Sequence, residues 1–163
     1  MPTEPSTPTI TLRPATAAPS DAELCFSLHA LAMRSLITQI WGWDENAQRT
    51  YFANSWDQAR TQIVLVDDVP RGVLIVEERN VSEEGKGEGW EIHIHRVEID
   101  PVVQGRGIGT VLINGVKQRA RETRTRVYLE VWAVNSRARV LYERLGFRVS
   151  REEGGKVFMQ WEP

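Results

Sequence analysis

A glycine-rich segment carries the clearest chemical signal in this chain. It consists of Gln104, Gly105, Arg106, Gly107, Ile108, Gly109 and Thr110. The segment follows a predicted strand and opens a predicted helix, whose first turn presents unpaired N–H groups and the positive end of the helix dipole. Glycines let phosphate oxygens approach such a backbone closely. A nucleotide P-loop would need a lysine here, and a dinucleotide-binding turn a third glycine in place of Thr110. The segment indicates a different phosphate site, or only a turn that starts a helix.

Titratable residues alternate along the strand predicted over residues 90–99. Side chains two apart on a strand share a face, which groups Glu91, His93, His95, Val97 and Ile99. The opposite face would carry Ile92, Ile94, Arg96 and Glu98, although a β-bulge near Val97 would shift this assignment. His93 and His95 could be surface histidines or a metal-binding His-x-His pair. Because the spacing marks no third ligand, we expect no metal site.

A second block, residues 135–147, begins with Asn135 and contains Tyr142. Asn135 stands where it can cap a helix predicted over residues 136–145. Four residues share one face of that helix, so spacing alone favours a core role for Tyr142; they are Ala138, Leu141, Tyr142 and Leu145.

Together these blocks resemble the GNAT superfamily of N-acetyltransferases. The pattern Gln-x-x-Gly-x-Gly after Val-Glu-Ile-Asp-Pro is similar to the acyl-CoA-binding signature of that family. The pattern Asn-x-x-Ala-x-x-Leu-Tyr-x-x-x-Gly-Phe is similar to its second block, and the gap between the blocks holds one helix and one strand. The resemblance spans about residues 10–161. It is specific for cofactor and fold and says little about the acceptor.

The resemblance implies that acetyl-CoA is a co-substrate bound between the strand that ends at Ile99 and a strand at residues 127–131. The backbone of Val97 and Ile99 would pair with the pantetheine arm, and the glycine-rich turn would hold the pyrophosphate. Asn135 would bind the pantetheine or order its loop. The cofactor-binding residues implied are Val97, Glu98, Ile99, Gln104, Gly105, Arg106, Gly107, Ile108, Gly109, Thr110, Asn135, Ala138 and Tyr142.

Catalytic roles also follow from the resemblance. Tyr142 would be the general acid that protonates the departing thiolate. His93 falls where several family members carry a carboxylate base, and its imidazole would take the amine proton directly. Glu91 would act through a water, although some members have no dedicated base. A backbone N–H near Val97 would stabilise the oxyanion.

The resemblance therefore predicts direct transfer of an acetyl group to a primary amine in a ternary complex. The alternative is a non-catalytic acyl-CoA-binding or sensing module on the same fold. Aromatic and acidic residues in the regions that usually shape the acceptor site favour a cationic small amine, amino sugar or peptide amino terminus. They are Trp41, Trp43, Asp44, Glu45, Tyr51, Phe52 and residues 82–89; Trp41 and Trp43 are equally well explained by packing.

Charge and composition restrict the protein class. The 163 residues have a net charge of −2, which argues against a dedicated nucleic-acid binder. The charge is split: residues 44–100 carry 13 acids and 6 bases, net −7, and residues 104–151 carry 11 bases and 3 acids, net +8. No run approaches the roughly 18 apolar residues of a membrane span. The one cysteine, Cys25, fits a reducing cytoplasm. Homodimers are common in the superfamily, but no residue here demonstrates one.

Periodicity and turn residues predict the elements that position these groups. Residues 1–9 are predicted to form a flexible tail, and residues 10–163 a single domain. Strands are predicted at residues 10–13, 62–66, 73–76, 90–99 and 127–131, near 147 and at 157–161. Helices are predicted from an N-cap at Ser20, with Glu23 completing a capping box, to Ile40, after Asp44 to Trp56, and over residues 107–122 and 136–145. Residues 67–70 would form a turn and 82–89 a hairpin loop. The class is α+β, GNAT-like, with a mostly antiparallel sheet of six to seven strands and about four helices.

Overall fold

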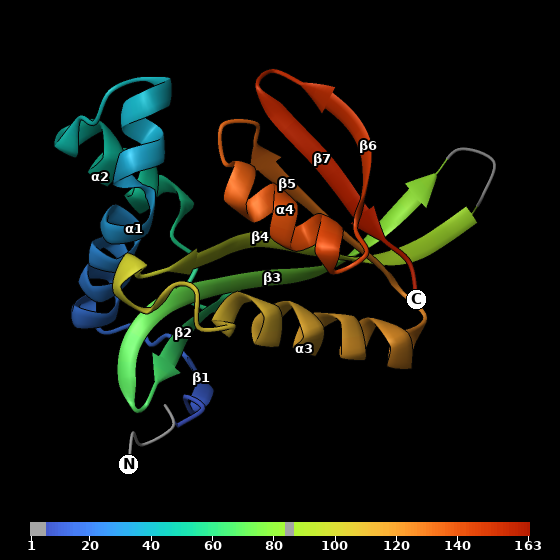
Figure 1. The fold of residues 1–163 in the computed structure, drawn as a ribbon, viewed down its shortest axis with the longest axis horizontal. Coiled ribbons are helices and arrows are strands. Elements are labelled where there is room, and N and C mark those ends of the chain that lie inside the picture. Colours follow the sequence, from blue (N-terminus) through green and yellow to red (C-terminus); the bar gives the residue numbers. More distant parts are fainter. Residues whose placement is uncertain (1–5, 84–86) are drawn as a thin grey trace, which may run out of the picture.

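A twisted mixed sheet organises the computed structural model, which describes residues 6–83 and 87–163 (Figure 1). Its strands are β1 (Ile10–Pro14), β2 (Thr61–Val66), β3 (Val69–Glu83), β4 (Gly87–Ile99), β5 (Arg126–Trp132), β6 (Arg148–Glu153) and β7 (Lys156–Trp161). The helices are α1 (Pro19–Ile40), α2 (Glu45–Ser55), α3 (Ile108–Thr123) and α4 (Ser136–Arg144), with a 3-10 turn at Pro101–Val103. The strand order is β1-β2-β3-β4-β5-β7-β6, and β4–β5 is the parallel pair among antiparallel neighbours. The predicted α+β architecture is confirmed.

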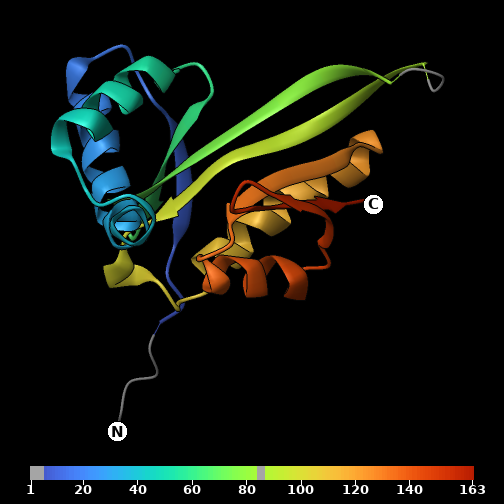
Figure 2. The ribbon, with the colours of Figure 1, turned by 90° about the horizontal axis from the view of Figure 1, so that it is seen from above.

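Helices cover both faces of the sheet, with α1 and α2 on one side of β3 and β4 and α3 and α4 on the other (Figure 2). On the α1 side, the buried core joins Cys25, Phe26 and Phe52 to the sheet. Burial raises the pKa of the Cys25 thiol to about 11, so this thiol is an inert core group at neutral pH. The core on the other side includes Ile92, Ile94, Ile113, Val116, Val127, Leu129, Tyr142 and Phe147. Among residues 6–83 and 87–163, no helix is both long and apolar enough to cross a membrane.

The start of α1 differs from the prediction. The helix begins at Pro19 with Ala18 as its N-cap, so Ser20 lies inside the first turn and the predicted cap is wrong. No side chain caps the helix; instead the Asp21 carboxylate, in the first turn, accepts a hydrogen bond from the Thr16 backbone N–H at 2.8 Å and holds the incoming chain. Proline is favoured at the first helical position, where its missing N–H is not needed.

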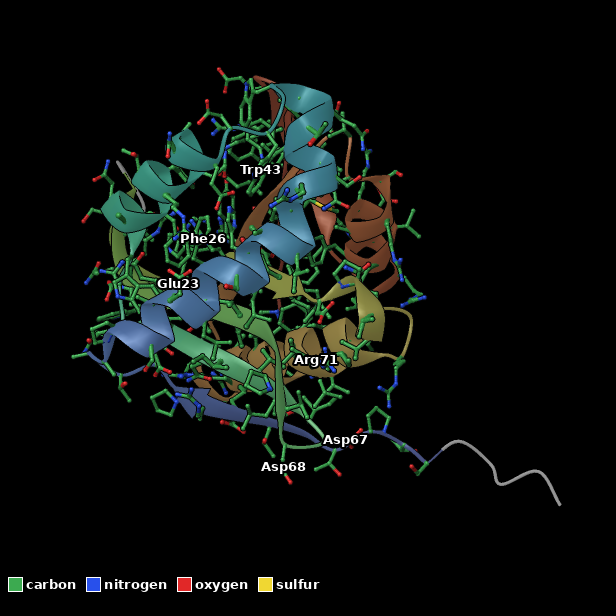
Figure 3. All side chains as sticks on the ribbon, turned by 90° about the vertical axis from the view of Figure 1, so that its left-hand side faces the viewer. Glu23, Phe26, Trp43, Asp67, Asp68 and Arg71 are labelled. Carbon is green, nitrogen blue, oxygen red and sulfur yellow. The ribbon has the colours of Figure 1, made fainter. Side chains whose placement is uncertain are left out.

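The strands of the central hairpins are longer than predicted. Strand β3 begins at Val69, because the turn is confined to Asp67 and Asp68, which both have positive φ (51° and 65°) (Figure 3). Two residues with positive φ form the tight turn that matches the twist of paired strands. The predicted loop at residues 82–89 is also too long, since β3 runs to Glu83 and β4 begins at Gly87. Residues 84–86 lie outside the described part of the chain.

Candidate active site

A cleft of about 710 Å³ opens where β4 and β5 separate. The two strands pair from Glu91↔Arg126 to Ile94↔Leu129, and the described chain has no β4–β5 pair beyond that point. Residues of β4, β5, α1, α2 and α4 line the cleft. The edges of β4 and β5 both face this opening. The resemblance to the GNAT superfamily implied that acetyl-CoA binds between these two strands.

The glycine-rich turn forms the start of α3, as predicted, and lies outside the lining of the cleft. Gly105 and Gly107 have φ of +77° and +79°, a region that favours glycine. Gly107 is the N-cap of α3 and provides no side-chain cap, so the first N–H groups of the helix are left for another acceptor. Gln104 holds the turn against the sheet, because its side-chain amide donates to the Ile99 carbonyl at 2.8 Å. These features suit an anion at this end of the sheet.

Three predicted residues of the second block do line the cleft, namely Asn135, Ala138 and Tyr142. Asn135 caps α4, since its side-chain oxygen accepts from the Ala138 N–H at 3.1 Å. Tyr142 is 8% exposed and packs against Phe147 in the core, so its structural role and its position at the cleft coexist. Burial raises the pKa of the Tyr142 phenol to about 12, which keeps it a proton donor at neutral pH.

A β-bulge changes the faces of β4. Ile75 pairs with Arg96 and Val76 with Ile94, which leaves His95 as the extra residue. Because a bulge resets the alternation, Val97 packs on the same core cluster as Ile94 rather than sharing a face with the histidines. Strict alternation is therefore wrong beyond His95, for Ile99 as well, which packs towards α3. The alternative with a bulge is confirmed.

Glu98, predicted as part of the cofactor-binding strand, has a buried side chain at the cleft. Its two carboxylate oxygens lie 3.0 and 3.1 Å from Nδ1 of His29, on α1. Nε2 of His29 lies 3.1 Å from Oε1 of Gln48, on α2. Burial alone would lower the pKa of His29, but the hydrogen bond and the charge of Glu98 outweigh it and raise that pKa. No local sequence pattern indicated this link between α1, α2 and β4, because its members are far apart along the chain.

The two predicted bases lie away from the cleft lining. His93 is 9% exposed, and neither ring nitrogen has a hydrogen-bond partner among the described residues. Burial lowers the pKa of its imidazole to about 4. Glu91 forms an ion pair with Arg79. His95 is the histidine of this strand that lines the cleft, and its Nε2 lies 2.7 Å from Oε2 of Glu77.

The predicted acceptor residues divide between the cleft and other places. Trp41, Asp44 and Tyr51 line the cleft, and Trp41 meets the Trp132 ring edge-on at 4.9 Å between centroids. Trp43 instead lies beside α1, under the Arg34 guanidinium at 4.6 Å (Figure 3). Other predicted acceptor residues also lie elsewhere: Glu45 accepts from the Trp43 indole N–H and Phe52 is core.

Glu130, which the sequence analysis missed, is the first β5 residue beyond the last pair with β4. Its carboxylate lines the cleft, is 36% exposed and accepts from the Lys156 ammonium at 2.8 Å. The alternation of β5 was the signal for it, because Val127, Leu129 and Val131 are buried and the residues between them face the other way.

Comparison with known proteins agrees with this geometry. The family model described as the acetyltransferase (GNAT) family matches residues 28–147. N-alpha-acetyltransferase RimI of Mycobacterium tuberculosis is 36% identical over 77 residues, which cover 47% of this chain and 48% of RimI. The matched segment thus spans about half the length of that relative.

Solved structures share the fold. The PaiA N-acetyltransferase of Thermoplasma acidophilum in complex with coenzyme A superposes with a TM-score of 0.74 at 13% identity, covering 95% of this chain and 99% of the other. NAA60 of Arabidopsis thaliana in complex with a bisubstrate analogue gives 0.62 at 22% identity, with the same coverage of 95% and 99%. Identities this low support the fold alone. The family match covers most of the chain and includes both sequence blocks, and the chain therefore belongs to the GNAT family of acetyltransferases.

Proposed function

We propose that the protein transfers the acetyl group of acetyl-CoA directly to a primary amine of a small molecule or peptide. One observation carries this proposal: Tyr142, Val97 and Glu130 line one cleft at the point where β4 and β5 part. A thioester at this point would meet a proton donor from α4, a strand edge from β4 and a carboxylate from β5. The thioester, the amine and these protein groups would be held in one ternary complex, as direct transfer requires.

Coenzyme A would enter from the glycine-rich turn. Its pyrophosphate would accept from the free N–H groups at the start of α3, and its pantetheine arm would run along the backbone of Val97 and Ile99 in the gap between the strands. The gap is open on the β4 side because the strand pairing stops at Ile94. Family membership and the coenzyme A complex of a structural neighbour support this placement.

Tyr142 would complete the reaction. The amine nitrogen attacks the thioester carbonyl carbon, the carbon–sulfur bond breaks, and the sulfur leaves as a thiolate that takes the phenol proton of Tyr142. A pKa of about 12 keeps that proton on the phenol until the thiolate forms. The phenolate then recovers a proton from solvent. An ammonium acceptor first loses one proton to a base and becomes a nucleophile, and its nitrogen loses a second proton to solvent after the attack. The thiolate gains one proton from Tyr142, which solvent replaces, so one proton is released overall.

Glu130 is the base that the cleft geometry supports. The predicted bases His93 and Glu91 do not line the cleft, and their role stays a prediction. Glu98 is tied to His29, Asp44 caps α2, and His95 is bound to Glu77. Glu130 is also bound, through Oε1 to the Lys156 ammonium at 2.8 Å, but it is a partly exposed carboxylate just beyond the last β4–β5 pair, so it can attract an ammonium group beside Lys156 and pass its proton to water.

A cationic amine is the acceptor that this wall favours. Trp41, Tyr51 and Trp132 provide aromatic faces, and Asp44 and Glu130 provide negative charge at the same cleft. RimI is named an N-alpha-acetyltransferase, which supports a peptide amino terminus as one member of this class. Release of free thiol from acetyl-CoA with a panel of cationic, neutral and anionic amines tests the class, and turnover of neutral or anionic acceptors alone contradicts it.

Substitution of the proposed acid separates this function from that of a non-catalytic acyl-CoA sensor. Tyr142→Phe should lower kcat by at least about 100-fold, the lower range for general acid catalysis, and leave coenzyme A affinity nearly unchanged. Tyr128→Phe, on β5 outside the cleft lining, is the matched control. A sensor would bind acetyl-CoA and release no thiol with any amine. Unchanged turnover in Tyr142→Phe removes the acid role but not the family assignment.

Glu130→Gln tests the base. The substitution should lower kcat/KM at neutral pH. This loss should become smaller as pH rises, because more of the amine is then unprotonated and needs no base. Glu153→Gln, an exposed carboxylate on β6, is the control. If the substitution lowers kcat/KM by the same factor at every pH, Glu130 acts in binding and not in proton transfer.

A further inference from the structure

One carboxylate and two imidazoles gather beside the cleft, on the face of the central hairpin formed by β3 and β4. Potential ligand atoms of Glu77, His93 and His95 all lie within 4.8 Å of one another. The set requires two features of the backbone. Glu77 and His93 are direct partners across the two strands, and His93 and His95, two residues apart on β4, lie on the same face. Their rings lie 4.0 Å apart between centroids.

His93 provides the second and independent observation. Its ring is more than nine-tenths buried, and neither Nδ1 nor Nε2 has a hydrogen-bond partner among the described residues. Buried polar atoms without partners destabilise a fold, and each such group requires an explanation. A neutral imidazole has one nitrogen lone pair free to bind, and here that pair lies next to a second imidazole and a carboxylate.

We propose that Glu77, His93 and His95 bind a divalent transition-metal ion, with Zn²⁺ the ion that fits best. Two imidazole nitrogens and one carboxylate oxygen are common zinc ligands, whereas Mg²⁺ and Ca²⁺ prefer oxygen alone. Zinc–ligand bonds of about 2.0–2.2 Å place tetrahedral ligand atoms roughly 3.3 Å apart. The 2.7 Å contact between His95 and Glu77 would therefore widen slightly, and His93 would close on the pair.

The surroundings hold the carboxylate in place for this role. Oε1 of Glu77 accepts from the Arg60 guanidinium at 2.9 Å, while Oε2 faces His95. Such outer contacts orient metal ligands and tune their affinity. Three protein ligands leave a fourth position of a tetrahedral ion for water or another small ligand, and His95 places the site at the edge of the cleft. The proposal is independent of acetyl transfer, since it rests on ligand geometry alone.

Titration calorimetry of the whole chain with ZnCl₂, after treatment with a chelator, tests the site. We expect one Zn²⁺ per chain and no saturable heat with MgCl₂. Glu77→Gln and His95→Gln each remove one ligand and should weaken binding by more than about 10- to 100-fold, the loss typical of an outer-shell partner. Glu78→Gln, the neighbouring carboxylate that pairs with Arg119, is the matched control and should retain wild-type affinity.

Cobalt gives a second readout that does not depend on calorimetry. Co²⁺ bound by these ligands should give visible absorption that Zn²⁺ displaces, and the absorption should be lost in His93→Leu, with circular dichroism confirming that this variant folds. Saturable zinc binding lost in the ligand variants and kept in Glu78→Gln supports the site. No saturable binding by the wild-type chain, or binding that survives loss of either Glu77 or His95, overturns it.

Discussion

Two buried histidines beside β4 have the same side chain and opposite surroundings. His29 is 3% exposed and His93 is 9% exposed, so burial hardly distinguishes them. His29 contacts Glu98 through one nitrogen and Gln48 through the other. His93 has no partner for either nitrogen among the described residues. The contrast teaches that a contacting carboxylate can outweigh the effect of burial on the pKa of an imidazole, and that burial prevails where no such partner is present.

The pKa values follow these partners. The carboxylate of Glu98 overcomes the effect of burial and raises the pKa of His29, which favours the imidazolium. At His93 burial acts first, the positive charges of His95 and Arg79 add to it, and the pKa falls to about 4. The His29 imidazole thus lies against a carboxylate that favours its protonated form and joins α1 to the sheet, whereas the His93 ring is neutral at pH 7 and free to accept a ligand.

The largest effect should come from breaking the partnered site. His29→Leu leaves the Glu98 carboxylate buried with Arg96, 3.7 Å away, as its remaining cation. Loss of one member of a buried ion pair destabilises by about 3–5 kcal/mol, and we expect the lower end because Arg96 stays. Urea denaturation at pH 7 measures this loss. The double variant His29→Leu/Glu98→Leu is the control, since it removes the stranded charge and should recover part of the stability. Equal losses in the two variants would contradict the ion pair.

A smaller effect should appear on acidification. Between about pH 6.5 and pH 4 the unfolded chain binds a proton at His93 that the folded chain excludes. The free energy of unfolding therefore falls as pH drops through this window, by up to about 3 kcal/mol from His93 alone. His29 has the opposite sign: its stabilisation is full below its unfolded pKa and is lost as pH rises through its raised folded pKa.

The effect of His93 is measured as a difference, because carboxylates also contribute near the lower end of this pH range; contact with His95, for example, lowers the pKa of Glu77 in the folded chain. Wild type and His93→Leu are denatured in metal-free buffer at several values from pH 7 to pH 4. The wild-type chain should lose more stability than the variant over this range. If the free energies of unfolding of the two proteins change in parallel with pH, folding does not lower the pKa of His93.

The sequence predicted most of the fold and several of the residues that line the cleft. The glycine pattern placed the start of α3 within one residue, and the Asn135 block placed α4 and Tyr142, because these signals are local. Contacts across the sheet could not be predicted from spacing. His29 meets a carboxylate 69 residues away, and Glu77 faces His93 through strand register. A bulge was expected near Val97 and lies at His95, because its position depends on pairing with β3, which no single strand reveals.

The smallest expected effect is the one that best defines the unpartnered site. At pH 7 without metal, His93→Leu should change the free energy of unfolding by no more than about 1 kcal/mol, or raise it, because it replaces two unsatisfied polar atoms by an apolar group of similar size. A loss as large as that in His29→Leu would show that His93 is partnered, and the comparison would fail. A small or favourable change together with lost zinc binding would mean that the chain keeps a residue that does not stabilise it. Residues of that kind are expected at functional sites, where stability is sacrificed for the binding of a ligand.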